Sequence, residues 1–193
     1  MIYIICAFEA EARALIDHYR LQKDSTQPYP LFYDEQKLIL ISGMGQQKAK
    51  EAVEYLLSQH KPSPNDVLVN LGICAAQERF PIGTLLHVHN LRSESESFEL
   101  TDAASALAQA SCYSTDKALA QAVETDIAEM EAISIYKAAS TVFAPSKISI
   151  LKVVSDHFKP FKIKKQFIID LIKPHIKEID AHIKTIQGKT DDR

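Results

Sequence analysis

Short apolar runs alternate along the chain with longer segments in which apolar residues recur every three or four positions. Short apolar runs are typical of buried strands, whereas the longer spacing is typical of helices that cover a sheet. The runs predict strands at residues 2–7, 37–42, 66–71, 84–88 and 149–154. The periodic segments predict helices at residues 9–19, 47–59 and 129–140. This alternation predicts an α/β fold rather than a helix bundle or a β-sandwich.

The C-terminal part of the chain carries one apolar stripe at helical spacing. Its members are Ile168, Ile172, Ile176, Ile179, Ile183 and Ile186. Because proline cannot continue a helix without a kink or a break, we expect the helix to kink or restart at Pro174 and to lie against the sheet. Residues 188–193 are polar and predict a frayed tail. The segments 23–30 and 90–102 are predicted to be loops.

Length and composition indicate one domain at residues 1–187. A chain of 193 residues with 46% hydrophobic content can bury a sizeable core. A net charge of -3 argues against a dedicated nucleic-acid binder. The apolar N-terminal run is too short, before Glu9 and Glu11, to be a signal peptide or a membrane span. The three cysteines contain no C-x-x-C pair. We therefore expect a cytoplasmic protein with neither a nucleic-acid nor a membrane partner.

Acidic residues and small-residue turns follow the ends of four predicted strands. In open α/β sheets, ligands bind outside the carboxyl ends of the strands, where loops and helix N-termini converge. The four endings are Phe8-Glu9-Ala10-Glu11, Ser42-Gly43-Met44-Gly45, Asn70-Leu71-Gly72-Ile73 and Val154-Ser155-Asp156-His157. The sequence thus predicts a ligand site at this edge of the sheet.

These four endings, in this order, resemble the active-site landmarks of the nucleoside phosphorylase and nucleosidase superfamily. Glu129-Met130-Glu131-Ala132 is similar to a further signature of that superfamily. The likeness is greatest to its 5′-methylthioadenosine nucleosidase branch and extends over most of residues 1–158. It implies a three-layer α/β/α sandwich around a mixed, mostly parallel twisted sheet. It also implies a small-molecule nucleoside as ligand, a homodimer or higher oligomer, and no metal or organic cofactor.

Cleavage of an N-glycosidic bond leaves positive charge on the ribose and negative charge on the base. An acid must therefore reach the base, and carboxylates must hold the sugar. By the resemblance, Glu11 activates the attacking water, Asp156 assists the leaving base, and Glu131 accepts hydrogen bonds from the ribose hydroxyls. The resemblance also implies that the substrate site includes Ser42, Gly43, Met44, Gly72, Met130 and Ser155.

Each acidic residue also has a purely structural interpretation. Asp156 would then cap the turn after the last strand. Glu9 is the alternative water-activating residue if the register is shifted by two, and in the structural interpretation either acid would lie in a solvated first helical turn. Glu131 would belong to a helix N-terminus that is enriched in acids by the helix dipole. Glu129 is expected to face solvent or a neighbouring helix.

Two features bear on the nucleophile and on the base. Phosphorylases of this superfamily hold phosphate with an arginine and a serine, but Gly72 is followed here by Ile73-Cys74-Ala75-Ala76. Water is therefore the expected nucleophile. The segment between Gly83 and Glu129 is short, and it has Ala118 where an aromatic residue would stack on a purine. A phosphorylase with an unrecognised anion site and a non-catalytic nucleoside-binding or scaffold protein stay as alternatives.

Overall fold

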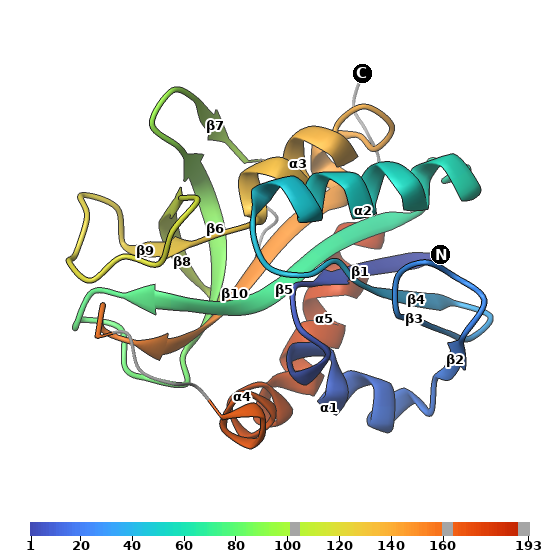
Figure 1. The fold of residues 1–193 in the computed structure, drawn as a ribbon, viewed down its shortest axis with the longest axis horizontal. Coiled ribbons are helices and arrows are strands. Elements are labelled where there is room, and N and C mark those ends of the chain that lie inside the picture. The colour runs from blue at the N-terminus through green and yellow to red at the C-terminus, as the bar shows by residue number, and fades with distance from the viewer. Residues whose placement is uncertain (101–104, 160–163, 189–193) are drawn as a thin grey trace.

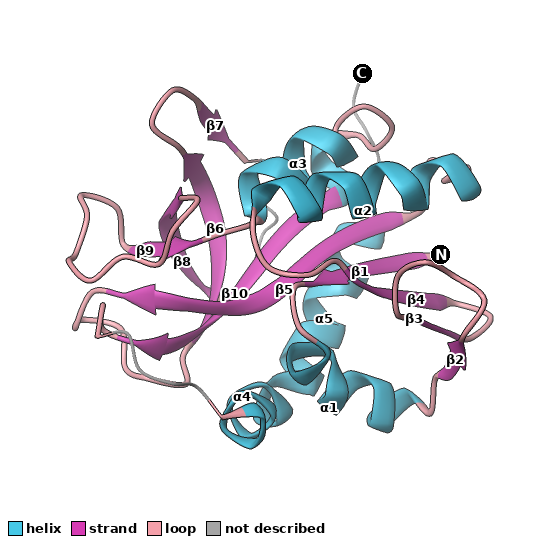
Figure 2. Ribbon diagram, in the orientation of Figure 1, coloured by secondary structure: helices cyan, strands magenta, loops and turns pink. Residues whose placement is uncertain are grey.

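The computed structural model describes residues 1–100, 105–159 and 164–188 (Figure 1). It has one mixed sheet with helices on both faces, so the predicted α/β class is confirmed. Figure 2 shows the sheet between two groups of helices. One face carries α2 (Gln46–Gln59) and α3 (Ala132–Ala139); the other carries α1 (Glu9–Tyr19), α4 (Lys165–Ile172) and α5 (Ile176–Gln187). Among the described residues, no helix is long and apolar enough to cross a membrane.

The strands of the sheet come from most of the described chain. They are β1 (Ile2–Cys6), β2 (Gln22–Asp24), β3 (Leu31–Tyr33), β4 (Lys37–Ile41), β5 (Val67–Ala76), β6 (Leu85–Arg92), β7 (Ser97–Glu99), β8 (Ala108–Ser114), β9 (Ile127–Glu129) and β10 (Ile148–Asp156). The parallel ladders join β1 to β4 and β5, β5 to β10, and β8 to β6 and β9. Antiparallel ladders add β2, β3 and β7 at the margins. The carboxyl ends of β1, β4, β5 and β10 therefore meet at one edge.

Part of the sheet curls until it closes on itself. Strand β10 pairs with both β5 and β6, and β9 pairs with both β8 and β5. Because β6 also pairs with β8, the strands β5, β10, β6, β8 and β9 form a ring. The sequence patterns did not predict this closure. It brings the ends of β5, β9 and β10 next to one another, where the acidic residues lie.

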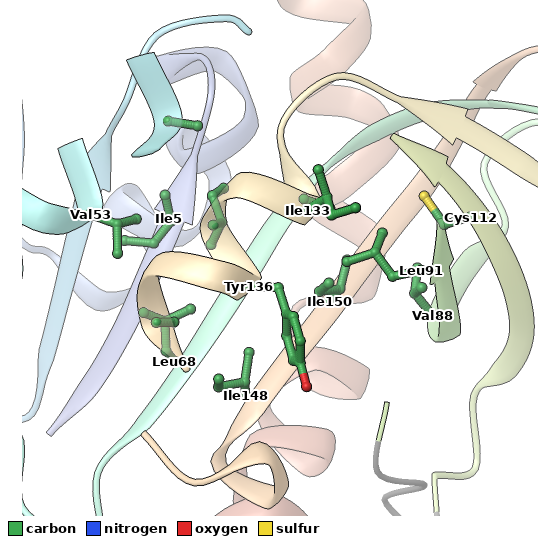
Figure 3. Close-up of a cluster of buried hydrophobic side chains, with 14 of the residues drawn as sticks. Ile5, Val53, Leu68, Val88, Leu91, Cys112, Ile133, Tyr136, Ile148 and Ile150 are labelled. Carbon is green, nitrogen blue, oxygen red and sulfur yellow. The ribbon is translucent and has the colours of Figure 1, made fainter. Parts of the chain in front are cut away.

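The hydrophobic core lies on both faces of the sheet. Successive side chains of a strand point to opposite faces. Accordingly, Tyr3 and Ile5 of β1 pack in one cluster with α2 and α3, and Ile4 and Cys6 pack in the other with α1, α4 and α5. Figure 3 shows part of the first cluster. A strand buried on both faces reads as a continuous apolar run, which is why β1 was recognisable in the sequence.

The C-terminal helices follow the isoleucine stripe. All six isoleucines of the stripe are buried against the sheet and α1. Pro174 lies in a short 3-10 turn, Lys173–His175, that joins α4 to α5, so the predicted restart is confirmed. Helix α5 ends at Gln187. Of the predicted tail, residues 189–193 lie outside the described residues.

Several boundaries differ from the sequence predictions. Strand β2 takes up residues 23 and 24 of the predicted loop 23–30, and β5 and β6 extend beyond their predicted ends to Ala76 and Arg92. The helix predicted at residues 129–140 begins at Ala132, because Ile127–Glu129 pairs as β9 between β8 and β5. The predicted loop 90–102 contains the end of β6 and the strand β7, which pair as a hairpin; residues 101–104 lie outside the described part. Strand β8 was missed because its sequence, AQASCYS, has neither a long apolar run nor strict alternation.

Truncation of Ile150 tests the importance of the core next to β5. Ile150 of β10 is fully buried and packs in the cluster of Figure 3. We expect Ile150→Ala to lower the free energy of unfolding by about 2–5 kcal/mol, because it leaves a cavity. Urea denaturation measures the loss. The control, Val142→Ala at an exposed position, should change stability by no more than about 0.5 kcal/mol. Equal losses in both variants would contradict the assignment of this core.

Candidate active site

A cavity of about 720 Å³ opens at the edge where the carboxyl ends of β1, β5 and β10 meet. Three acidic residues that are distant in the sequence line it together: Glu11, Glu131 and Asp156. They come from the first turn of α1, the residue before α3 and the last residue of β10. The closed ring of strands and the turn after β1 thus bring the three carboxyl groups to one space.

Glu11 is held in a fixed orientation by two backbone groups. One carboxyl oxygen, Oε2, accepts the N–H of Phe8 at 2.9 Å, which caps the start of α1. The other, Oε1, accepts the N–H of Ile73 at 3.0 Å and ties the helix to β5. Burial raises the pKa of Glu11, and the two N–H groups and the charge of Lys152 oppose that rise. Each oxygen keeps a lone pair for a further hydrogen bond.

Gly72 gives Glu11 the room it occupies. A Cβ atom at this position would lie 2.9 Å from Glu11 Oε1 and 3.5 Å from Lys152 Nζ. The first distance is too short for any side chain. Gly72 therefore allows a carboxylate and an ammonium group to approach the backbone of β5 from the same side.

Glu131 connects the starts of two helices. It precedes α3, and its Oε1 accepts the N–H of Gly45, which precedes α2, at 2.8 Å. Gly45 has a φ of 99°, a conformation that favours glycine. Burial and the neighbouring charge of Glu129 raise the pKa of Glu131 to about 7. Its second oxygen, Oε2, is available to a ligand in the cavity.

Glu129 does not face solvent, and its main partner is a strand residue rather than a helix, so that expectation was wrong in both respects. Because residues 127–129 pair as β9, the side chain of Glu129 points to the interior and meets Lys152 of β10. The Nζ to Oε2 distance is 2.8 Å, and both side chains are 1% exposed. Although burial opposes ionisation of both groups, Lys152 holds the pKa of Glu129 below its ordinary value, and the carboxylates raise the pKa of Lys152.

Lys152 is the residue of the site that the sequence reasoning missed. It is the one charged residue in the buried run 148–154 (ISILKVV), and that charge was the available signal. A fully buried lysine is rare unless a partner compensates its charge. The partner, Glu129, lies 23 residues away, and its burial depends on the pairing of β9.

Asp156 stands at the end of β10, beyond an irregularity in the strand. The register between β10 and β5 shifts between Val154 and Asp156, which re-aims the last side chain. Ser155 Oγ lies 2.8 Å from Asp156 Oδ2 and 3.0 Å from the carbonyl oxygen of Cys74. The other carboxyl oxygen of Asp156 accepts the N–H of Lys159 at 3.2 Å. Ser155 therefore orients a half-buried carboxyl group at the cavity wall.

The remaining predicted substrate residues divide into two groups. Met44, Met130 and Ser155 line the cavity. Ser42, Gly43 and Gly72 are not part of its lining; Ser42 Oγ instead donates to backbone carbonyl oxygens, of which that of Gly43 is at 3.0 Å. These three residues shape the turn and the strand behind the lining.

Part of the lining of the cavity is aliphatic. It consists of small or branched side chains, with Thr115 as a polar neighbour: Ala75, Ala118, Leu119 and Ala128. Ala118 thus lines the cavity at the position where the resemblance would put an aromatic residue. Within the described residues, no group of three or more His, Cys, Asp or Glu side chains could hold a metal ion.

Comparison with known proteins gives a fold likeness only. No protein-family model matches the sequence, and no curated protein matches it. Among solved structures, the 5′-methylthioadenosine nucleosidase of Arabidopsis thaliana matches with a TM-score of 0.80 and 14% identity, over 98% of this chain and 96% of that chain. The methylthioadenosine/S-adenosylhomocysteine nucleosidase of Campylobacter jejuni matches with a TM-score of 0.76 and 15% identity, over 97% of this chain and 99% of that chain.

A third structure, the corresponding nucleosidase of S. pneumoniae with a transition-state inhibitor, gives a TM-score of 0.73 and 16% identity. It covers 96% of this chain and 99% of that chain. The chain therefore has the fold of these nucleosidases along nearly its whole length. The resemblance indicated by the strand ends is confirmed at the level of the fold.

The raised pKa of Glu131 predicts a particular dependence of stability on pH. A carboxyl group whose folded pKa lies near 7, against an ordinary 4.5, stabilises the fold fully below pH 4.5 and loses that contribution as the pH rises through 7. We expect Glu131→Gln to remove a decline of about 1–3 kcal/mol in the free energy of unfolding across this range. Denaturant titrations of both proteins from pH 4 to pH 8 measure it. If the free energy of unfolding changes with pH in the same way in both proteins, Glu131 titrates normally and the prediction is wrong.

Proposed function

We propose that the protein is a nucleosidase, an N-ribosyl hydrolase that cleaves the glycosidic bond of a purine or related nucleoside. The observation that carries the proposal is the convergence of Glu11, Glu131 and Asp156 on one cavity. Its volume of about 720 Å³ falls in the range of small-molecule sites, roughly 300–1,000 Å³. The likeness of the fold to nucleosidases supports the same reaction class.

The three carboxyl groups suit the charges that develop during glycosidic cleavage. The ribose becomes oxocarbenium-like, so negative groups around it stabilise the transition state more than the ground state. Glu131 Oε2 would accept hydrogen bonds from the ribose hydroxyls while Oε1 stays bound to Gly45. Met130 and Met44, which also line the cavity, would pack against the sugar.

Glu11 would activate the attacking water. A general base must be ionised and must have a free lone pair within hydrogen-bond reach of the water. Glu11 has one on each oxygen beyond its bonds to Phe8 and Ile73. Both hydrogen bonds come from rigid backbone, so the carboxylate of Glu11 is oriented before the substrate arrives.

Asp156 would assist the departure of the base. In its protonated form it would donate to a ring nitrogen of the leaving base, with Ser155 holding the carboxyl group in place. In the proposed arrangement, Asp156 thus acts on the nucleobase, and Glu11 acts through the attacking water on the ribose, at the other end of the bond that breaks.

Water is favoured over phosphate as the nucleophile. Phosphate would require cationic groups that are free to bind it. Arg13, which lines the cavity, already contacts the carboxylates of Glu9 and Asp17. Its charge is therefore compensated within α1. Lys165 also lines the cavity and is exposed, with no ion pair among the described residues, so base release is compared with and without phosphate.

The proposal predicts release of free base from a nucleoside without phosphate. A panel that includes adenosine, inosine and 5′-methylthioadenosine is incubated with the protein, and free base is measured by chromatography. Asp156→Asn should lower kcat by a factor of about 10²–10⁴, because the amide cannot supply the proton. The control, Glu54→Gln, changes an exposed carboxylate of α2 outside the cavity and should leave the rate unchanged.

Other outcomes select the alternatives. Release of ribose 1-phosphate only when phosphate is present would indicate a phosphorylase. Binding of a nucleoside without any release of base, unchanged in Asp156→Asn, would indicate a non-catalytic nucleoside-binding protein. A homodimer or higher oligomer, expected from the resemblance, stays a prediction that sedimentation velocity would test.

A further inference from the structure

The buried ion pair between Glu129 and Lys152 has no step in the proposed reaction. Both side chains are 1% exposed, and their nearest charged atoms are 2.8 Å apart. Removing two charges from water costs about as much as their attraction returns, so such a pair adds little stability over apolar side chains. Glu129 also lines the cavity, with Lys152 paired to it, and this position suggests a role in the site instead.

Glu129 fixes the backbone that carries Glu131. Its Oε2 accepts the N–H of Glu131 at 3.0 Å, and both of its oxygens accept the N–H of Ala132, at 2.9 and 3.0 Å. Ser114 adds a second connection, because its hydroxyl bonds Glu129 and accepts the N–H of Ile133 at 3.1 Å. The first turn of α3 is therefore held through one ionised carboxylate, and Glu131 is held with it.

Lys152 lies between that carboxylate and Glu11. Its Nζ and Glu11 Oε1 both approach the same point above Gly72, at 3.5 and 2.9 Å from a Cβ placed there. An ammonium group has three N–H donors, and Glu129 takes one of them. The ammonium charge thus acts on carboxylates of α1 and β9 and on Glu131 at the start of α3.

We propose that Lys152 is a positioning residue for the reaction: through Glu129 it fixes Glu131, and as a shared counter-ion it favours the ionised forms of Glu11, Glu129 and Glu131. Its consequence for catalysis rests on the proposed function. The groups that face Glu131 are Glu129 from β9, Lys152 from β10, Glu11 from α1 and the N–H of Gly45. The pKa values agree, because the charge of Lys152 lowers those of Glu11, Glu129 and Glu131.

Direct titration tests the proposal without any substrate. Side-chain carboxyl signals of ¹³C-labelled protein are followed from pH 4 to pH 9 in the wild type, Lys152→Met and Lys152→Arg. Lys152→Met should move the midpoint of Glu131 upward from about 7 by about one pH unit or more, because a compensating charge is lost. Lys152→Arg keeps the charge and should leave the midpoint within about half a unit of wild type. An unchanged midpoint in Lys152→Met would overturn the proposal.

A second variant covers the case in which Lys152→Met does not fold, since it leaves Glu129 buried and uncompensated. The double variant Glu129→Gln with Lys152→Met removes both charges, a change that proteins often tolerate. Its Glu11 signal should still titrate about one pH unit higher than in wild type, because Glu11 loses the charge of Lys152. A wild-type midpoint for Glu11 would count against the shared counter-ion.

Kinetics test the link to the reaction. Lys152→Met should lower kcat at least about tenfold with a smaller change in KM. In the pH profile of kcat for this variant, the acidic limb should move to higher pH than in the wild type. Lys152→Arg should restore both. A purely structural lysine would lower the melting temperature and leave the pH profile in place. If the wild type releases base from no nucleoside, the proposed function fails, and the carboxyl titrations still decide the role of Lys152.

Discussion

Strand β5 pairs with three other strands, and most of the candidate site takes its position from these ladders. Its first residues pair with β1, its last two pair with β9, and β10 follows it from Leu68 to Ala75. A strand of ten residues at the centre of a sheet must have its backbone groups satisfied on both sides. Here one side changes partner from β1 to β9, and the sheet curls at that change. Glu11 contacts β5 just there, through the N–H of Ile73.

That arrangement explains how three buried carboxyl groups tolerate one another in a small space. An isolated buried carboxylate would take up a proton rather than stay charged. Backbone N–H groups compensate Glu11, and Lys152 compensates Glu129. Glu131 has one N–H bond from Gly45, and burial and the charge of Glu129 raise its pKa to about 7. Donors fixed in advance need no reorganisation when charge develops on a ligand, which is the property that a site for an oxocarbenium-like sugar needs.

The sequence predicted what depends on neighbouring residues and missed what depends on strand pairing. The run Ile2–Cys6 and the acids after it were recognisable, because burial on both faces and the start of α1 are local features. The acids at Glu131 and Asp156 were found through their motifs, and the structure brings them to the same cavity as Glu11. Glu129 was misjudged because a helical start was assumed where β9 pairs with two distant strands. Without that pairing, Lys152 had no visible partner, so the ion pair could not be predicted from either residue alone.

Two kinds of lining residue offer different kinds of recognition. Glu11 and Glu131 present carboxyl groups, and hydrogen bonds to charged groups are strong and directional. Ala75, Ala118, Leu119 and Ala128 offer shape and apolar contact. Apolar contact discriminates weakly between ligands that differ by one small group, whereas a site that hydrogen-bonds a hydroxyl strongly rejects a ligand that lacks it. Under the proposed function, the ribose is therefore the part of the substrate that the protein selects, and the base is the part in which it accepts variation.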